Sequence, residues 1–361
     1  MNYLSISPRL APVADGSPRK RPRSAAAACL LTASALLLTG CGSGSSTGSA
    51  TSASSGSSGS AADAQPDAGA YPVTIASKFG SATLKKQPTR VVALGWSDQD
   101  AALALGVRPV AVVKTEDSFE HGVGPWDQAA LGSSRPEVLD TTDGYPVEKI
   151  AALHPDLILA VQSGLTSADY AKLSKIAPTV GYTKDRVAYG TPWQEQTRLI
   201  GKALGRGKEA EQAVTKVTDE LKQDASTYPN LKGKTFIYAY PMPSTGSIVL
   251  YDDERTNLLK SVGMTLDPVV SKAKKLNTFA HRISSERTDE LTSDALLVWY
   301  NTAKDQRQLE SDATFSALPA VKNKAYAGMD RTEAQATSAP SVLSIPWVMK
   351  RLLPSLNAGL K

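Results

Sequence analysis

The chain of 361 residues contains 40 Lys and Arg residues and 35 Asp and Glu residues, so its formal charge is +5. Five of those basic residues but only one acidic residue fall within residues 1–40, so the chain from residue 41 onward carries a charge of only +1. A balance this even leaves no basic field to attract nucleic acid, and we therefore exclude a nucleic-acid-binding function.

The first forty residues have the layout of a secretory signal. A basic segment, Arg19–Arg23, precedes an apolar stretch, Ala25–Leu38, which is too short to cross a bilayer comfortably because a span takes about 20 residues. A Leu-Thr-Gly-Cys motif that ends at Cys41 follows and resembles a bacterial lipobox, whose cysteine is acylated and becomes the new N-terminus. We expect residues 1–40 to be removed and Cys41 to anchor the protein to the extracytoplasmic face of the cell membrane. The alternative is an ordinary signal peptide with a chance cysteine.

The segment after this motif, residues 42–70, consists almost entirely of Gly, Ser, Ala and Thr. Such a composition cannot bury enough apolar surface to fold, so we expect a flexible tether that spans roughly 30 Å. Because Cys29 would leave with the signal, the lipidated Cys41 would be the last cysteine. This excludes a disulfide, a thiol nucleophile and a cysteine metal site in the mature protein.

Short apolar runs alternate with helical patterns in the next part of the sequence. The predicted strands are Arg90–Gly95, Val110–Val113 and Leu157–Val161, and the predicted helices are Ala101–Leu105, capped from Ser97–Asp100, then Glu148–Leu153 and Ser167–Ile176. Strands that alternate with helices in this way predict a mostly parallel sheet with helices on both faces.

Two helical patterns occupy the middle of the chain. Thr191 and Pro192 are typical of a helix N-cap and first helical position, and the pattern continues to Leu204. A second helix, from about Lys208 to Ser226, places its apolar residues on one stripe. At 1.5 Å per residue this second helix would be roughly 28 Å long.

The alternation of strands and helices then starts again. The predicted elements are the strands Thr235–Tyr240 and Ala295–Tyr300, the edge strand Lys324–Ala327, and the helices Asn257–Val262, Phe315–Leu318 and Val342–Leu353. Residues 71–361 also reach the length, roughly 250–300 residues, at which chains split into two domains. We therefore expect two lobes.

Motifs for catalysis and metal binding are missing. The sequence after residue 70 contains neither a Gly-x-Ser-x-Gly elbow nor a phosphate-binding loop, and its three histidines, His121, His154 and His281, are far apart. A receptor that ligates zinc or manganese would offer more imidazole. Asp252 and Asp253 could serve acid–base catalysis, but a solvated loop end is the simpler interpretation. We expect no enzyme, no catalytic residue and no protein-bound metal.

Aromatic and basic residues instead follow the predicted strands, where open α/β sheets bind ligands. The aromatic candidates for a binding site are Trp96, Trp126, Trp193, Tyr240 and Tyr300, and the basic candidates, which lie in polar loops, are Arg186, Arg255 and Arg331. Any one of these aromatic residues is equally suited to packing, and any one arginine to a solvated surface. The hypothesis is that several of them share one site.

Three segments resemble the iron-siderophore substrate-binding proteins of ABC importers. They are Thr89–Trp96, Glu148–Ala160 and Phe315–Asn323, while Ser163–Thr166 and Pro192–Gln196 are similar to the Gram-positive and actinobacterial branch of that family. The likeness covers residues 71–355. The segment that contains Asp156 is specific to this class of binding protein, and no segment is specific to one siderophore.

The resemblance implies an α/β fold in which two Rossmann-like lobes are bridged by a single long helix, with the ligand cleft between the lobes. Residues 71–207 would form the N-terminal lobe, 208–227 the connecting helix and 228–361 the C-terminal lobe. A single connecting helix implies little hinge closure. The family also implies an acidic residue on each lobe that docks on the permease; by local position these would be Asp169 and Glu254, or the neighbours of Glu254.

The function that the resemblance implies is capture of a ferric siderophore and its delivery to an ABC permease dimer in the membrane. The aromatic candidates would form the walls of the site and the arginines its anion contacts. The siderophore fills the iron coordination sphere, so no cofactor is expected, and we expect a monomer. The chemistry of the siderophore, whether catecholate, hydroxamate or carboxylate, stays open. A cobalamin or haem receptor of the same fold is the alternative, and an anchored surface hydrolase a weaker one.

Overall fold

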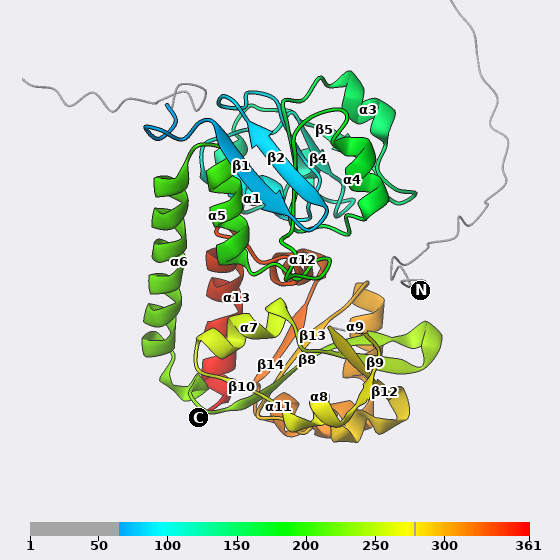
Figure 1. Ribbon diagram of the computed structural model, residues 1–361. Coiled ribbons are helices and arrows are strands. Elements are labelled where there is room, and N and C mark those ends of the chain that lie inside the picture. The colour runs from blue at the N-terminus through cyan, green and yellow to red at the C-terminus, as the bar shows by residue number, and fades with distance from the viewer. Residues whose placement is uncertain (1–64, 278) are drawn as a thin grey trace, which may run out of the picture. The chain divides into compact units, whose positions relative to one another are not determined.

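The computed structural model describes residues 65–277 and 279–361, which form two α/β lobes and a connecting helix (Figure 1). Cys41, the expected signal peptide and most of the expected tether lie outside these described residues. No helix among the described residues is both long enough and apolar enough to cross a membrane. The two lobes and the helix between them confirm the fold class expected from the sequence.

The N-terminal lobe contains a five-stranded sheet in the order β5-β4-β3-β6-β7, and every neighbouring pair in it is parallel. Its strands are β3 (Val91–Ala93), β4 (Ala111–Val113), β5 (Glu137–Leu139), β6 (Leu157–Ala160) and β7 (Thr179–Gly181). All residues of β3, β4, β6 and β7 are buried. Uninterrupted apolar runs are the pattern of parallel strands that are covered on both faces, which is why the sequence predicted this sheet.

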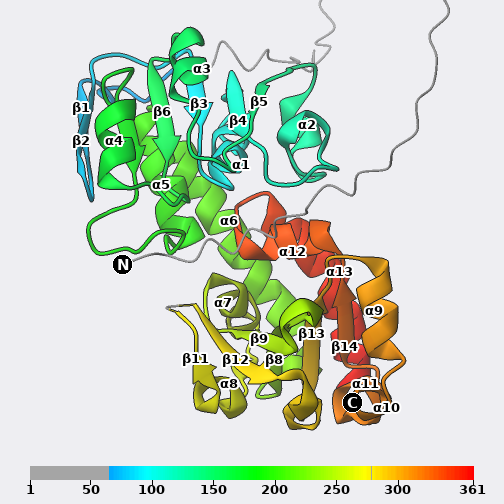
Figure 2. The ribbon, with the colours of Figure 1, turned by 90° about the vertical axis from the view of Figure 1, so that its right-hand side faces the viewer.

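Helices cover both faces of this sheet (Figure 2). Val91 packs with α1 and α5 in one core cluster, whereas its neighbour Val92 packs with α3 and α4 in another, as the alternation of side chains along a strand requires. The helices of this lobe are α1 (Asp98–Ala104), α2 (Gln128–Leu131), α3 (Val147–Ala152), α4 (Ser167–Leu173) and α5 (Trp193–Ala203). A hairpin of β1 (Val73–Ser77) and β2 (Gly80–Leu84) packs on the side of α5.

The helix α6 (Gly207–Thr227) connects the lobes and runs beside both of them (Figure 1). Its buried stripe consists of Ala210, Val214, Val217 and Leu221. Ala210 belongs to a core cluster of the N-terminal lobe, whereas the other three belong to the main core cluster of the C-terminal lobe. One amphipathic helix therefore contributes to two cores, which makes it a stiff connection rather than a loose linker.

The C-terminal lobe differs because its sheet is mixed. Its strand order is β11-β12-β9-β8-β13-β14, with β10 beside β8; β9 and β12 run antiparallel to their neighbours, and β8, β13 and β14 are parallel. The strands are β8 (Thr235–Met242), β9 (Ser247–Tyr251), β10 (Thr265–Leu266), β11 (Lys274–Lys275), β12 (Ala280–Ser284), β13 (Ala295–Trp299) and β14 (Tyr326–Met329). A tight turn over Pro243–Thr245 closes the β8–β9 hairpin, and Gly246 after it adopts a φ of 58°, which glycine tolerates best.

The three helices predicted for the C-terminal lobe are found in place more than in length, and the lobe has further helices that the sequence did not predict. They are α7 (Glu254–Ser261), α8 (Pro268–Lys272), α9 (Ala303–Glu310), α10 (Ala313–Ala317), α11 (Pro319–Lys322), α12 (Arg331–Ser338) and α13 (Ser344–Gly359). α7 begins three residues before the predicted start because Asp253 caps it: its carboxylate accepts a hydrogen bond from the Arg255 N–H, and its own N–H donates to Thr256. The predicted Thr191 cap of α5 is wrong, since Pro192 holds the N-cap position.

The lobes also touch each other away from α6. Ser341 Oγ, just before α13, donates a hydrogen bond of 2.6 Å to Asp100 Oδ2 in α1. The rings of Trp126 and Trp347 lie 5.2 Å apart, edge to face. Arg331, the first residue of α12, pairs with Glu116 of the N-terminal lobe. In both ribbon views α12 lies on the side of its lobe that faces the other lobe (Figures 1 and 2).

Candidate functional site

An exposed aromatic pair marks the N-terminal lobe. Trp96 follows β3 and is 38% exposed, and Tyr189 in the loop after β7 is 37% exposed. Their ring centroids are 4.8 Å apart. In the described part of the chain, the exposed large hydrophobic side chains are these two and Val187. Such a concentration of apolar surface after parallel strands indicates a binding surface.

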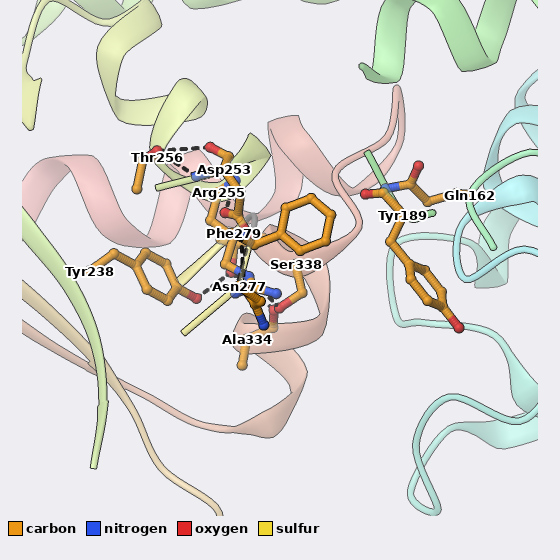
Figure 3. Close-up of polar contacts among 11 residues, drawn as sticks. Gln162, Tyr189, Tyr238, Asp253, Arg255, Thr256, Asn277, Phe279, Ala334 and Ser338 are labelled. Carbon is orange, nitrogen blue, oxygen red and sulfur yellow. Dashed lines mark hydrogen bonds and ion pairs between the residues drawn. The ribbon is translucent and has the colours of Figure 1, made fainter. Parts of the chain in front are cut away.

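Hydrogen bonds fix the backbone of both residues of this pair. The Trp96 N–H donates to the Gln162 carbonyl at 2.9 Å, and the buried Gln162 side chain donates to the Tyr189 carbonyl at 3.0 Å (Figure 3). The Tyr189 N–H donates to Ser163 O at 3.1 Å. Tyr189 needs this support because its φ of 58° lies in the left-handed region, which costs a non-glycine residue about 1 kcal/mol. Strain that surrounding contacts maintain is characteristic of functional loops.

Two of the aromatic candidates lie inside the protein instead, and a third is half-buried. Trp193 is 4% exposed and packs in the main core cluster of the C-terminal lobe. Tyr300 is 2% exposed, and its hydroxyl is 2.8 Å from that of Tyr326. Trp126 is half-buried, and its indole N–H donates to Asp100 Oδ2 at 2.8 Å. In this structure these side chains pack against other residues of the chain, and their role in ligand binding stays a prediction.

The remaining aromatic candidate, Tyr240, stacks on Trp299, with ring centroids 3.8 Å apart and planes 9° from parallel. The side-chain amide of Asn301 donates to the Tyr240 hydroxyl. Ala239 on β8 pairs with Val298 on the parallel strand β13, which brings the next residues, Tyr240 and Trp299, side by side. Because faces alternate along a strand, Trp299 shares the face of Tyr240 while Tyr300 lies on the opposite one. The sequence analysis proposed Tyr300 as a candidate, whereas the preceding residue, Trp299, is the one that stacks on Tyr240.

Arg331 connects the lobes. Its Nε donates to Glu116 Oε2 at 2.7 Å, and its Nη1 donates to Asn301 Oδ1 at 3.3 Å. Glu116 follows β4, and its side chain is 12% exposed against 39% for that of Arg331. Burial raises the pKa of Glu116, and the Arg331 guanidinium opposes that rise. The sequence did not reveal Glu116 because no local signal links it to a partner 215 positions away.

Arg186 lies in the loop of the exposed aromatic pair. Its guanidinium binds the Glu195 carboxylate in the first turn of α5 at 2.6 and 2.8 Å, and Thr183 Oγ1 donates to the same carboxylate at 2.9 Å. The bond to Glu195 raises the pKa of Arg186, and Glu254 in the C-terminal lobe contributes to the rise. The negative charge of Glu254 therefore acts on Arg186 from the other lobe.

Arg255 is the most enclosed of the three arginines, with a side chain that is 16% exposed. Its Nη1 is 3.3 Å from Asp253 Oδ2, its Nε donates to Ser338 Oγ at 3.1 Å, and its guanidinium carbon lies 3.9 Å from the centre of the Tyr251 ring. Figure 3 shows this cluster on one side of the view and Tyr189 with Gln162 on the other. Phe279 lies beside the cluster in Figure 3, and a Cβ added to Gly190 would be 3.6 Å from its ring.

The two candidate docking carboxylates lie at helix starts. Asp169 forms a capping box with Thr166 at the start of α4. Glu254 is the first residue of α7 and accepts a hydrogen bond from Asn257 at 3.2 Å. Burial raises the pKa of Glu254, and the positive charge of Arg186 opposes that rise. Its neighbour Asp252 is exposed and pairs with Lys260 at 3.0 Å. The docking role of these residues stays a prediction. Among the described residues, no cluster of three or more His, Cys, Asp or Glu side chains is arranged to hold a metal ion.

A family model described as periplasmic binding protein matches residues 91–331. The chain belongs to this family. The matched residues run from the first strand of the N-terminal sheet, through α6, to the start of α12, so they include both lobes of the binding protein. The family resemblance inferred from the sequence is confirmed.

Named relatives of this periplasmic binding protein are themselves binding proteins. The Fe(3+) dicitrate-binding periplasmic protein FecB of Escherichia coli is 24% identical over 72% of this chain and 83% of its own length. The iron(3+)-hydroxamate-binding protein FhuD of Bacillus subtilis is 25% identical over 74% of this chain and 82% of its own.

Solved structures agree with the fold. A periplasmic solute-binding protein of Mycobacterium smegmatis is 32% identical, with a TM-score of 0.72, and the match covers 80% of this chain and 99% of that one. Streptococcus pneumoniae PiaA in complex with ferrichrome is 28% identical, with a TM-score of 0.68, over 80% of this chain and 98% of the other. These structures match both lobes of the described region.

Proposed function

We propose that this periplasmic binding protein captures a ferric siderophore and delivers it to an ABC permease in the membrane. The relatives whose names state a ligand bind ferric chelates, and the chain resembles them over both lobes. The observation that carries the proposal is the exposed pair Trp96 and Tyr189. The Gln99 side chain donates to the Trp96 carbonyl and to Asp100, and Asp100 in turn accepts the hydrogen bond from Ser341 of the other lobe.

The proposed ligand lies between the facing surfaces of the two lobes. Trp96 and Tyr189 form an apolar wall on one side, and Trp299, stacked on the buried Tyr240, lines the other with Arg331. Flat rings suit a bulky organic chelate because they offer a large contact area with little loss of side-chain freedom. The siderophore supplies every iron ligand, and the protein supplies contacts to the outer surface of the chelate. We expect the protein to act as a monomer without a cofactor.

Titration of intrinsic tryptophan fluorescence with ferric chelates tests this function. Ferric hydroxamate, catecholate and citrate complexes are compared with the same chelators free of iron, and with haem and cobalamin. We expect saturable quenching by at least one ferric chelate, and binding at least tenfold weaker for the iron-free chelator. Saturable binding of haem or cobalamin alone would reject the siderophore proposal in favour of the other receptor class.

The second part of the proposal is delivery from the membrane surface. We propose that Cys41 carries the lipid anchor, because it closes the Leu-Thr-Gly-Cys motif behind an apolar stretch. Each buried methylene adds about 0.8 kcal/mol of membrane affinity, so two or more acyl chains hold a protein at the membrane nearly permanently. Fractionation of cells that express Cys41→Ala should find the protein in the medium. Retention of that variant in the membrane fraction would contradict the anchor.

A further inference from the structure

Each of the three arginines near the facing lobe surfaces is already paired with a carboxylate of this chain. The pairs are Arg186 with Glu195, Arg255 with Asp253 and Arg331 with Glu116, at distances of 2.6, 3.3 and 2.7 Å. In none of these pairs are the two residues four positions apart on one helix, as in the common i,i+4 ion pair of helix surfaces. Positive charge that the sequence offered for ligand anions is therefore balanced inside the protein.

These pairs are built into the fold, because further groups hold their members in place. Glu195 also accepts from Thr183, Arg331 also donates to Asn301, and Arg255 also donates to Ser338. The two more accessible arginines, Arg186 and Arg331, have side chains that are 40% and 39% exposed, whereas their carboxylate partners are 27% and 12% exposed. The carboxylates are thus less accessible than the arginines that they pair with. A ligand that approaches either arginine would meet a guanidinium whose charge the buried carboxylate already balances.

A balanced site gives an anion little electrostatic attraction in return for its lost hydration. Glu254 adds a further carboxylate whose charge acts on Arg186 from the opposite lobe, while Arg186 already has Glu195 as its partner. The three guanidinium groups therefore leave no net positive charge for a ligand anion. Because removing an anion from water has a large free-energy cost that an opposite charge must offset, such a site discriminates between ligands of similar shape.

We propose that this site selects ferric chelates without net negative charge, and that Glu116 and Glu195 determine this selectivity. The inference rests on the proposed function. Three singly charged hydroxamate groups balance Fe³⁺ and give a neutral complex, whereas three doubly charged catecholate groups leave a charge of −3. A paired guanidinium still presents N–H donors to the neutral carbonyl oxygens of a hydroxamate complex, but it offers little net charge to a trianion.

The test compares a neutral ferric trihydroxamate, ferrichrome, with a trianionic ferric tris-catecholate of the enterobactin type on the wild-type protein. We expect ferrichrome to bind at least tenfold more tightly at 0.15 M salt. Its affinity should change less than twofold between 0.05 and 0.5 M salt, because binding a neutral chelate to a balanced site leaves little charge to screen. The salt comparison needs no variant, so it does not depend on the folding of a mutant.

The second arm removes the balancing charges. In Glu116→Gln/Glu195→Gln the side chains keep their shape and lose their charge, so Arg331 and Arg186 become unbalanced cations. We expect the tris-catecholate to bind at least tenfold more tightly to this variant than to the wild type, with ferrichrome affinity changed less than threefold. Glu211→Gln is the matched control: Glu211 pairs with Arg198 at 2.7 Å on the outer surface of α5 and α6, and its loss should leave both affinities unchanged.

The outcomes separate the inference from the function on which it rests. Wild-type protein that binds the trianionic chelate as tightly as the neutral one would overturn the charge selectivity while leaving siderophore capture intact. If the folded double variant binds the tris-catecholate no more tightly than the wild type, Glu116 and Glu195 do not determine the charge selectivity. Failure of every ferric chelate to bind would reject the proposed function and the selectivity together.

Discussion

The two lobes use aromatic and charged residues in opposite ways. The N-terminal lobe, built on an all-parallel sheet, leaves Trp96 and Tyr189 exposed after its strands. The C-terminal lobe, built on a mixed sheet, stacks Tyr240 on Trp299 and closes Arg255 into a buried pair. One lobe therefore offers an open apolar surface, and the other a preorganised polar surface whose charges are already balanced. A ligand between them would meet apolar area on one side and fixed hydrogen-bond donors on the other.

The largest effect should come from a ring buried in the C-terminal lobe. Trp193→Ala empties a site in its main core cluster, where Trp193 packs beside residues of α6. Loss of a buried tryptophan costs about 3–5 kcal/mol of unfolding free energy. Urea denaturation followed by circular dichroism measures this loss, with Trp193→Phe as the milder control. A loss below about 1 kcal/mol would show that Trp193 is not a core residue.

The next effect concerns the acidic cluster where the lobes meet. Burial raises the pKa of Asp100 to about 7, and it also raises the pKa values of the neighbouring Asp98 and Asp127. A carboxyl whose pKa is higher in the folded protein binds protons more tightly there, so its stabilising contribution is complete below about pH 4 and is lost as the pH rises toward 7.

We therefore expect wild-type stability to fall between about pH 4 and pH 7, by on the order of 2–4 kcal/mol from Asp100. Asp100→Asn keeps the acceptor for Ser341 and removes the charge, so its stability should depend less on pH in this range. Urea denaturation at several pH values measures both slopes. Equal slopes in wild type and variant would contradict the raised pKa of Asp100.

The two lobes also differ in how much of their structure the sequence could predict. The parallel strands of the N-terminal lobe were predictable because each reads as an uninterrupted apolar run, as in Leu157–Ala160. The antiparallel strand β9 was missed because it follows a three-residue turn instead of a helix, and β12 was missed because His281 and Arg282 interrupt its apolar pattern. Trp96 was predictable from its place after β3. Tyr189 and Glu116 were not, because a loop with a positive φ and a pairing across 215 residues leave no periodic signal.

A smaller effect should come from the ion pair that joins the lobes. A double-mutant cycle with Glu116→Gln and Arg331→Gln should give a coupling of about 1 kcal/mol, because Arg331 is 39% exposed and solvent screens the pair. The coupling should fall as salt is raised from 0.05 to 0.5 M. The same cycle on Arg198 and Glu211, both about half exposed, should give a smaller value. Equal couplings for the two pairs would show that burial of Glu116 adds nothing.

The smallest effect on stability should come from the exposed pair of the N-terminal lobe. Trp96→Ala removes a ring that is 38% exposed, so the unfolding free energy should change by less than about 0.5 kcal/mol. The contrast with Trp193→Ala distinguishes a binding surface from a core. A stability loss comparable to that of Trp193→Ala would place Trp96 among the packing residues.

The most direct test of binding between the lobes is the calorimetric affinity of wild type, Trp96→Ala and Tyr189→Ala for the ferric chelate that binds best. Each chelate face stacked on an aromatic ring contributes on the order of 1–2 kcal/mol, so each variant should bind about tenfold more weakly while keeping its fold. Trp347→Phe is the matched control and should bind like the wild type, because the Trp347 ring packs on Trp126 and not on Trp96 or Tyr189. Unchanged affinity in both Trp96→Ala and Tyr189→Ala would contradict the account.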